Sequence, residues 1–363
     1  MHTSGSPSKV GVVRKGANQW RALNDEQKLL VTKVSSIRAI LSAMQSHPDK
    51  PIVQIQACST LRAMTQEEVN LELLPRLGAV EVLMAAMGSH QGNAAVQQEA
   101  CAVLRNLSSN SDNQLIMSKI NGIISMILRA MQSNPTESGV QEHACGMLWN
   151  LAKRDEVKQS IAKCGGIEIV VAGMKNNIQS AEVQEQACGA LATIATGREE
   201  YKVLSAKHGA VEAIIAAMKA HPAESSMQPN ACWALLVITG PDDNNALASK
   251  LGAVDAVMAV MKASPMDPDI QQHACEALAN IALDSANKLL LAKVGAVEAI
   301  LTAMRNHPAD ATVQNNACLG LWNISAHDEN RAQLAQLGAV ELILVAMKQH
   351  LMKAAVQANA CGA

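Results

Sequence analysis

The stretch NKLLLAKVGAVEAILTAMRNHPADATVQNNACLGLWNISAHDE, from Asn287 to Glu329, determines the fold of this chain because it recurs along the sequence. A cysteine preceded by alanine returns every 43 or 44 residues, and a methionine returns at matching intervals. These ruler cysteines are Cys58, Cys101, Cys145, Cys188, Cys232, Cys275, Cys318 and Cys361, and the methionines are Met44, Met87, Met131, Met174, Met218, Met261, Met304 and Met347. This period predicts a solenoid, in which one unit of structure stacks on copies of itself.

The composition fits a packed helical array. The 363 residues include 18 methionines but no phenylalanine, so the core must come from aliphatic side chains, Met and Cys. A net charge of −2 gives no long-range attraction to nucleic acid or anionic membranes. No apolar run is long enough to cross a bilayer, and residues 1–19 lack the apolar core of a signal peptide. We therefore expect an intracellular protein of the cytoplasm, with the nucleus as a further location, and no membrane insertion.

The cysteines agree with a reducing compartment. Equivalent residues in successive repeats lie about 10 Å apart, whereas a disulfide needs Cα atoms within about 7 Å. We expect the internal ruler cysteines to be buried thiols that react last, and Cys361, near the end of the chain, to react first. Cys164 lies off the ruler beside Gly165, and we expect it to react at an intermediate rate. A structural thiol is favoured there over a reactive one.

Each repeat reads as three helices. In the quoted copy, a short apolar segment ends at Gly295, a glycine that predicts a helix end and a turn. The next segment places Val297, Ile300, Leu301 and Met304 on one helical face. Six copies place an acidic residue just after the first of these positions, at Glu81, Glu168, Glu212, Asp255, Glu298 and Glu341. After a His-Pro or similar break, a third helix runs through the ruler cysteine.

The stretch NxxxxxxxGAVExIxxAMxxHPxxxxVQxxACxxLxNIA resembles the armadillo motif. The resemblance covers residues 26–363, with eight copies beginning near residues 27, 70, 113, 157, 200, 244, 287 and 330. It implies an all-α, right-handed solenoid of armadillo repeats with three helices per repeat and a concave groove lined by third helices. A weaker resemblance connects the AM–HP–VQ–AC variant with the armadillo region of Roco-type leucine-rich-repeat kinases. Residues 1–25 are predicted to form a flexible polar arm, and the eighth copy reads as truncated, as in a fragment of a longer array.

A candidate binding surface follows from the helical wheel of the third helix. The position five residues after each cysteine lies almost opposite the core. It holds asparagine in four copies, at Asn106, Asn150, Asn280 and Asn323. Exposed asparagines can bind the backbone of an extended peptide through amide donors and acceptors. Resemblance to importin-α-like and β-catenin-like arrays implies the same role for these four residues.

The tryptophan pattern departs from the importin pattern. Importin-α-like arrays have a tryptophan four residues before the asparagine, where this chain has Ala102, Gly146, Glu276 and Leu319. Trp233 occupies that position once, but its asparagine is replaced by Val237. Trp149 and Trp322, with Arg105 at the equivalent position, lie instead at the edge of the predicted core. These residues either cover the seam between repeats or contact a partner, and both readings stay open.

Other residues point to structure rather than chemistry. His143 with Cys145, and His273 with Cys275, lie about 160° apart on a helix and cannot share a metal ion. A glutamine ladder, four residues before each cysteine, is expected to satisfy backbone groups near the start of each third helix. Histidines after the second helices are expected to favour the negative helix end. We predict no enzyme, no metal and no cofactor.

Two functions remain in view. The first is a non-enzymatic interaction scaffold that binds an extended segment of a partner protein along the groove. The alternative is an architectural or regulatory segment of a larger multidomain signalling protein, and a nuclear import adaptor ranks below both. The partner class is protein or peptide rather than nucleic acid, and the sequence leaves the oligomeric state open.

Overall fold

The computed structural model describes residues 24–363. Within that range the chain forms 23 α-helices, α2 to α24, and no strand. It divides into two compact units, the first ending at Ile116 and the second beginning at Met117. A flexible arm was predicted for residues 1–25. Residues 1–23 lie outside the described range, and α2 begins at Asp25, inside the predicted arm.

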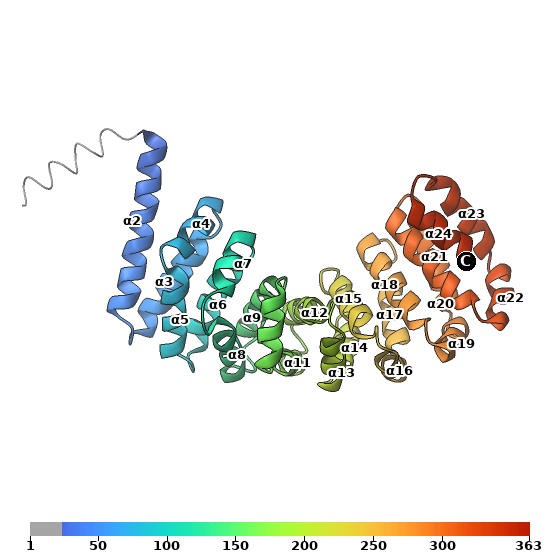
Figure 1. The fold of residues 1–363 in the computed structure, drawn as a ribbon, viewed down its shortest axis with the longest axis horizontal. Helices are drawn as coiled ribbons and strands as arrows, with labels where there is room; N and C mark the ends of the chain where they lie inside the picture. The colour runs from blue at the N-terminus through green and yellow to red at the C-terminus, as the bar shows by residue number, and fades with distance from the viewer. Residues whose placement is uncertain (1–23) are drawn as a thin grey trace, which may run out of the picture. The chain divides into compact units, whose positions relative to one another are not determined.

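The first unit has one long helix followed by shorter ones (Figure 1). Its helices are α2 (Asp25–Ser46), α3 (Pro51–Met64), α4 (Glu68–Arg76), α5 (Ala79–Ser89), α6 (Ala94–Ser108) and most of α7 (Ser111–Ser118). Third helices α3 and α6 pack on each other, and the second helix α5 packs on α2 and α6.

The second unit repeats the order of first, second and third helix. Its second and third helices come as pairs, α8 (Ile123–Ser133) with α9 (Ser138–Leu151), α11 (Gly166–Asn176) with α12 (Ala181–Ala195), α14 (Ala210–Ala220) with α15 (Met227–Ile238), α17 (Ala253–Ala263) with α18 (Pro268–Ile281), α20 (Ala296–Asn306) with α21 (Ala311–Ser325), and α23 (Ala339–Gln349) with α24 (Ala354–Gly362). Its first helices are α10 (Asp155–Lys163), α13 (Glu199–Lys207), α16 (Asp242–Lys250), α19 (Ser285–Lys293) and α22 (Asp328–Gln336). Each third helix packs on the next one, from α9 through α24.

A glycine in the left-handed region makes the turn between first and second helix. Gly209, with φ of 81°, stands between α13 and α14, and glycines with φ between 71° and 84° occupy the same place in the other copies that have this turn. The first copy differs from the predicted three-helix pattern because Ser35 occupies the glycine position. A side chain disfavours the left-handed conformation, and α2 continues through Ser35 as a single 22-residue helix.

The glutamine ladder closes each second helix. Gln184 Nε2 donates to Met174 O at 3.0 Å and to Asn177 O at 2.9 Å. The same pair of bonds, to the carbonyls ten and seven residues earlier, is made by Gln54, Gln97, Gln141, Gln228, Gln271, Gln314 and Gln357. These carbonyls belong to the end of the second helix and the turn after it, and would otherwise lack donors. The prediction placed the satisfied groups near the third-helix start. This holds for the carbonyl in the turn, whereas the other carbonyl belongs to the second helix.

Histidines connect successive repeats. His221 Nε2 lies 2.7 Å from Ile178 O, and His307 Nε2 lies 3.0 Å from Pro265 O. Because a carbonyl oxygen only accepts, Nε2 must hold the proton in each case. The expected location at second-helix ends is confirmed, since His221 and His307 follow α14 and α20 directly. Their bond to the preceding repeat was not foreseen.

We predict that replacing Gln184 by methionine destabilises the array by about 1–3 kcal/mol, because two buried carbonyls lose their donor while the volume stays similar. The control is Gln179→Met, at an exposed position of the loop after α11. Urea unfolding followed by circular dichroism measures the difference. Equal midpoints for the two variants would contradict the structural role of the ladder.

Candidate functional site

The candidate binding surface is the third-helix face, defined as the positions one, four and five residues after each ruler cysteine. In the second unit these positions lie on α9, α12, α15, α18 and α21, whose packing places them side by side. Trp233, Glu276 and Leu319 are half-buried on this face. Trp322 is the most exposed of the tryptophans in the described residues, at 44%.

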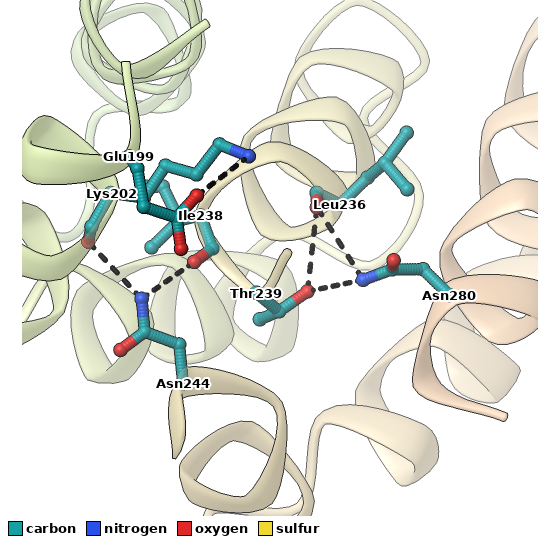
Figure 2. Close-up of polar contacts among 7 residues, drawn as sticks. All are labelled: Glu199, Lys202, Leu236, Ile238, Thr239, Asn244 and Asn280. Carbon is teal, nitrogen blue, oxygen red and sulfur yellow. Dashed lines mark hydrogen bonds and ion pairs between the residues drawn. The ribbon is translucent and has the colours of Figure 1, made fainter. Parts of the chain in front are cut away.

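The four predicted asparagines are half-buried rather than exposed. Figure 2 shows Asn280 pointing toward the preceding repeat, where its Nδ2 donates to Thr239 Oγ1 at 2.8 Å and approaches Leu236 O at 3.5 Å. Asn323 Nδ2 donates to Ala279 O at 2.9 Å, and in the first unit Asn106 Nδ2 donates to Thr65 Oγ1 at 2.7 Å. The expectation of an exposed asparagine ladder was therefore wrong, because each of these side chains is half-buried. A helical wheel of a single helix does not include the neighbouring third helix, which covers part of each asparagine side chain.

The amide oxygens remain available. Among the described residues, no donor lies within hydrogen-bond distance of Asn280 Oδ1 or Asn323 Oδ1. The amide nitrogen is held by the preceding repeat, so the orientation of the oxygen is fixed. Asn280 and Asn323 each bind the preceding repeat through Nδ2 and keep Oδ1 as a hydrogen-bond acceptor at the third-helix face. Asn150 is likewise half-buried, at the end of α9.

The tryptophans at the edge of the core cover glycines of the next repeat. A Cβ atom placed on Gly189 would lie 2.5 Å from Trp149 Cδ2, and one on Gly362 would meet the indole of Trp322. The glycine is in each case the residue after the next ruler cysteine. Both indoles therefore cover the seam between repeats, one of the two roles left open by the sequence. The exposed part of Trp322 leaves partner contact open for that residue.

The remaining predicted residues occupy third-helix positions within their own units. Trp233 is half-buried on α15, at the position that glycine occupies beneath Trp149 and Trp322. Arg105 is half-buried on α6 in the first unit. At the equivalent position of the preceding copy, Arg62 Nε lies 3.1 Å from Glu99 Oε2. The structure brings the second-unit residues onto one surface but shows no single cluster of them.

Sequence analysis missed a second asparagine ladder, on the first helices. Asn244 Nδ2 donates to Ile238 O at 2.8 Å and to Lys202 O at 3.2 Å, linking three helices (Figure 2). Asn330 makes the equivalent bonds to Ile324 O and Lys288 O. The signal was present, because asparagine recurs at the start of the quoted motif. Both asparagines are buried, so this ladder is structural.

The ruler cysteines belong to the core. All seven internal ones are buried, while Cys164 and Cys361 are exposed. Burial raises the pKa of Cys58, Cys101, Cys145, Cys232 and Cys275 to about 12. Among residues 24–363, all cysteines are free thiols and no group of three or more potential ligands could hold a metal ion. No helix in this range has the length and hydropathy needed to span a membrane.

Comparisons with known proteins identify the repeat. The family model described as "LRRK2 ARM repeat" matches residues 23–363. No curated protein sequence gives a significant match. These repeats are therefore recognised through the family pattern and not through one close relative.

Solved structures share the fold. An engineered protein aligns with a TM-score of 0.58 and 26% identity, over 68% of this chain and 96% of its own. A structure titled for a phosphorylation switch that controls the interaction between cadherin and beta-catenin aligns with a TM-score of 0.53 and 17% identity, over 90% of this chain and 67% of its own. A designed armadillo repeat protein in complex with the peptide (KR)4 aligns with a TM-score of 0.53 and 24% identity, over 64% of this chain and 96% of its own. The all-α armadillo solenoid predicted from the sequence is confirmed.

We predict that native thiol labelling modifies Cys361 and Cys164 in the folded protein, while the seven internal ruler cysteines label only when the array opens. Their burial and raised pKa both suppress the reactive thiolate. Pulsed alkylation with peptide mass spectrometry measures each site. Labelling of Cys232 or Cys275 as fast as Cys361 would contradict a cysteine core.

We predict that stability falls as pH rises above about 8.5. Unfolded thiols ionise near that pH, whereas the folded ones titrate near 12, so the unfolded state releases protons first and is favoured. Each buried thiol contributes about 1.4 kcal/mol per pH unit. Urea unfolding of the Cys232→Ala, Cys275→Ala double variant should show a shallower loss between pH 8.5 and 10 than the parent. Parallel pH profiles would refute this linkage.

Proposed function

The chain belongs to the armadillo-repeat family described as LRRK2 ARM repeat, and on that premise we propose that it is a non-enzymatic protein–protein interaction scaffold. Its third-helix face would bind an extended segment of a partner protein. We place this function in the cytoplasm or nucleus, with protein or peptide as the partner and no nucleic acid.

The carrying observation is the fixed amide oxygen at the third-helix face. Asn280 and Asn323 each use Nδ2 to bind the preceding repeat and leave Oδ1 without a donor. Backbone N–H groups of an extended segment are suitable donors. Adjacent helices pack 8–10 Å apart and an extended chain rises about 3.3 Å per residue, so roughly three residues span one repeat. In the polyproline-II form of such a segment, with three residues per turn and a rise of about 3.1 Å per residue, every third N–H faces the same side, so oxygens spaced by one repeat can each accept from one of them.

Two structural neighbours support this proposal. The designed armadillo repeat protein was solved with the peptide (KR)4, and the beta-catenin structure is titled for an interaction with cadherin. Their identities of 24% and 17% establish a common fold, and the transfer of peptide or protein binding to this chain is our inference.

The alternative is an architectural or regulatory armadillo segment of a larger multidomain signalling protein. The family description favours it, because the ARM repeat is named there as part of LRRK2. An import adaptor has less support, since Trp233 is the only tryptophan at the position that such arrays use, and Val237 replaces its asparagine.

We predict that the triple variant Asn280→Ala, Asn323→Ala, Trp322→Ala weakens binding of extended peptides at least tenfold, because two acceptors and one exposed indole are lost. The probes are peptides selected from a displayed random library on the full chain. Fluorescence anisotropy gives the dissociation constants.

The matched control is the double variant Asn244→Ala, Asn330→Ala. It also removes two amides that bond to a preceding repeat, but these are buried at the first helices. Thermal unfolding checks that both variants stay folded at the assay temperature. Equal affinity losses in the two variants would assign the effect to stability and remove the third-helix face as the binding site.

A further inference from the structure

A pocket of about 410 Å³ opens between the second helices α8 and α11, on a surface distinct from the third-helix face. Its lining includes Met131, Gln132 and Gln141 from one repeat and Cys164, Glu168 and Gly173 from the next. Apolar and polar groups are both present: Met131 and Ile169 supply a wall, and three amide side chains and one carboxylate supply hydrogen-bonding groups. We refer to it as the α8–α11 pocket.

The later repeats show what occupies the equivalent place. A Cβ atom built on Gly209 would lie 3.0 Å from Lys175 Nζ and 3.6 Å from Glu212 Oε2. A Cβ atom built on Gly252 would lie 3.5 Å from Lys219 Nζ and 3.8 Å from Asp255 Oδ2. In these two seams a lysine from one repeat therefore places its ammonium beside the turn glycine, where the carboxylate of the next repeat also lies, although among the described residues the two groups form no direct ion pair.

The α8–α11 pocket has the carboxylate without the cation. Gln132 stands where Lys175 and Lys219 stand in the later repeats, one residue after the ruler methionine. No atom lies within 4 Å of a Cβ built on Gly165, the turn glycine of this seam. Glu168 keeps a side-chain exposure of 69%, and among residues 24–363 its one ion pair is a 4.0 Å approach to His208 Nδ1.

A buried acceptor in the same pocket has no donor. Gln141 is 1% exposed, its Nε2 binds Met131 O and Asn134 O, and its Oε1 has no hydrogen-bond partner. That oxygen is directed across the seam, because it would lie 2.5 Å from a Cβ on Gly173. The corresponding oxygens of Gln184 and Gln228 also lack partners, so the missing cation is what distinguishes this seam. Unpaired buried acceptors favour a ligand that donates hydrogen bonds.

The first unit repeats this arrangement on a smaller scale. A pocket of about 280 Å³ between α2 and α5 is lined by Gln45, Gln54 and Glu81. Gln45 again replaces the lysine, and Gln54 Oε1 again has no partner. In contrast, the pocket of about 460 Å³ between α17 and α20 has Lys262 in its own lining. Two separate seams therefore have a carboxylate, Glu168 or Glu81, but a glutamine in place of the lysine.

We propose that the α8–α11 pocket binds the guanidinium group of an arginine side chain from a partner protein. The guanidinium supplies the positive charge that Lys175 and Lys219 supply in the next two seams, and its several N–H donors suit a carboxylate together with amide oxygens. Met131 and Ile169 contact the aliphatic stem. This site is independent of the third-helix face and of the peptide binding proposed there.

The test uses the methionines of the full chain as reporters. Protein labelled with ¹³C at the methionine methyl groups is titrated with N-acetyl-arginine amide and, in parallel, with the neutral N-acetyl-citrulline amide. Met→Leu substitutions assign the signals. We expect the arginine compound to shift Met131, which lines the pocket, and to leave Met258 and Met261 of the α17–α20 pocket unchanged. The citrulline compound should bind at least tenfold more weakly.

Two variants test the charge argument. Gln132→Lys supplies an internal cation as at Lys175, and Glu168→Gln removes the carboxylate, so each should weaken the response of Met131 at least tenfold. Gln179→Lys, in the exposed loop after α11, controls for net charge. A Met131 shift that persists in both variants, an equal response to citrulline, or no Met131 shift at all would overturn the proposal. Peptide binding to the third-helix face is measured separately and does not depend on this result.

Discussion

The double hydrogen bond from each ladder glutamine is the interaction on which every repeat depends. A second helix ends in carbonyl groups that lack intrahelical donors, and the following turn must reverse the chain within a few residues. One buried amide satisfies a carbonyl of the helix and a carbonyl of the turn at once, at 2.9 Å each for Gln141. Because the glutamine belongs to the third helix, the bond also sets how second and third helices pack. The ruler cysteine, one turn later, can then be a small apolar residue in a seam of constant width.

Polar side chains also join the repeats to one another. His221 and Asn244 each donate to a carbonyl of the preceding repeat, and Asn280 donates to a threonine hydroxyl there. An asparagine in such an array is therefore weak evidence for partner contact by itself. What distinguishes Asn280 from Asn244 is its place on the third-helix face, where the side chain is half-buried, whereas Asn244 is buried. The functional argument rests on that position and on the amide oxygen that Asn280 leaves without a donor there.

The periodicity of the sequence was sufficient to predict the helices, the turn glycines and the buried cysteines, because each follows from one repeat considered alone. Features that depend on two repeats were predicted only in part. The seam contact of Trp149 with Gly189 was one of two readings left open, whereas the cover over Asn280 and the bond from His221 to Ile178 were not predicted. Each of these contacts joins residues about 40 positions apart. The continuous α2 helix was visible in principle, since Ser35 replaces a turn glycine, but the other copies made a turn seem uniform.

Differences among copies are more informative about function than the shared pattern. Where an indole covers a seam, at Trp149 and Trp322, the next repeat has glycine at the contacted position, and where the bulky Trp233 takes that position the preceding repeat has Ala192 in place of the indole. In each of these cases side chains of the chain itself fill the seam between repeats, so the substitution is explained without a partner protein. The exchange at Gln132 is different, because no cation takes the place of the lost lysine beside Gly165, where no atom lies within 4 Å of a Cβ built on that glycine. A substitution compensated inside the chain reports on packing, and one left uncompensated beside a pocket indicates that the complementary group comes from outside.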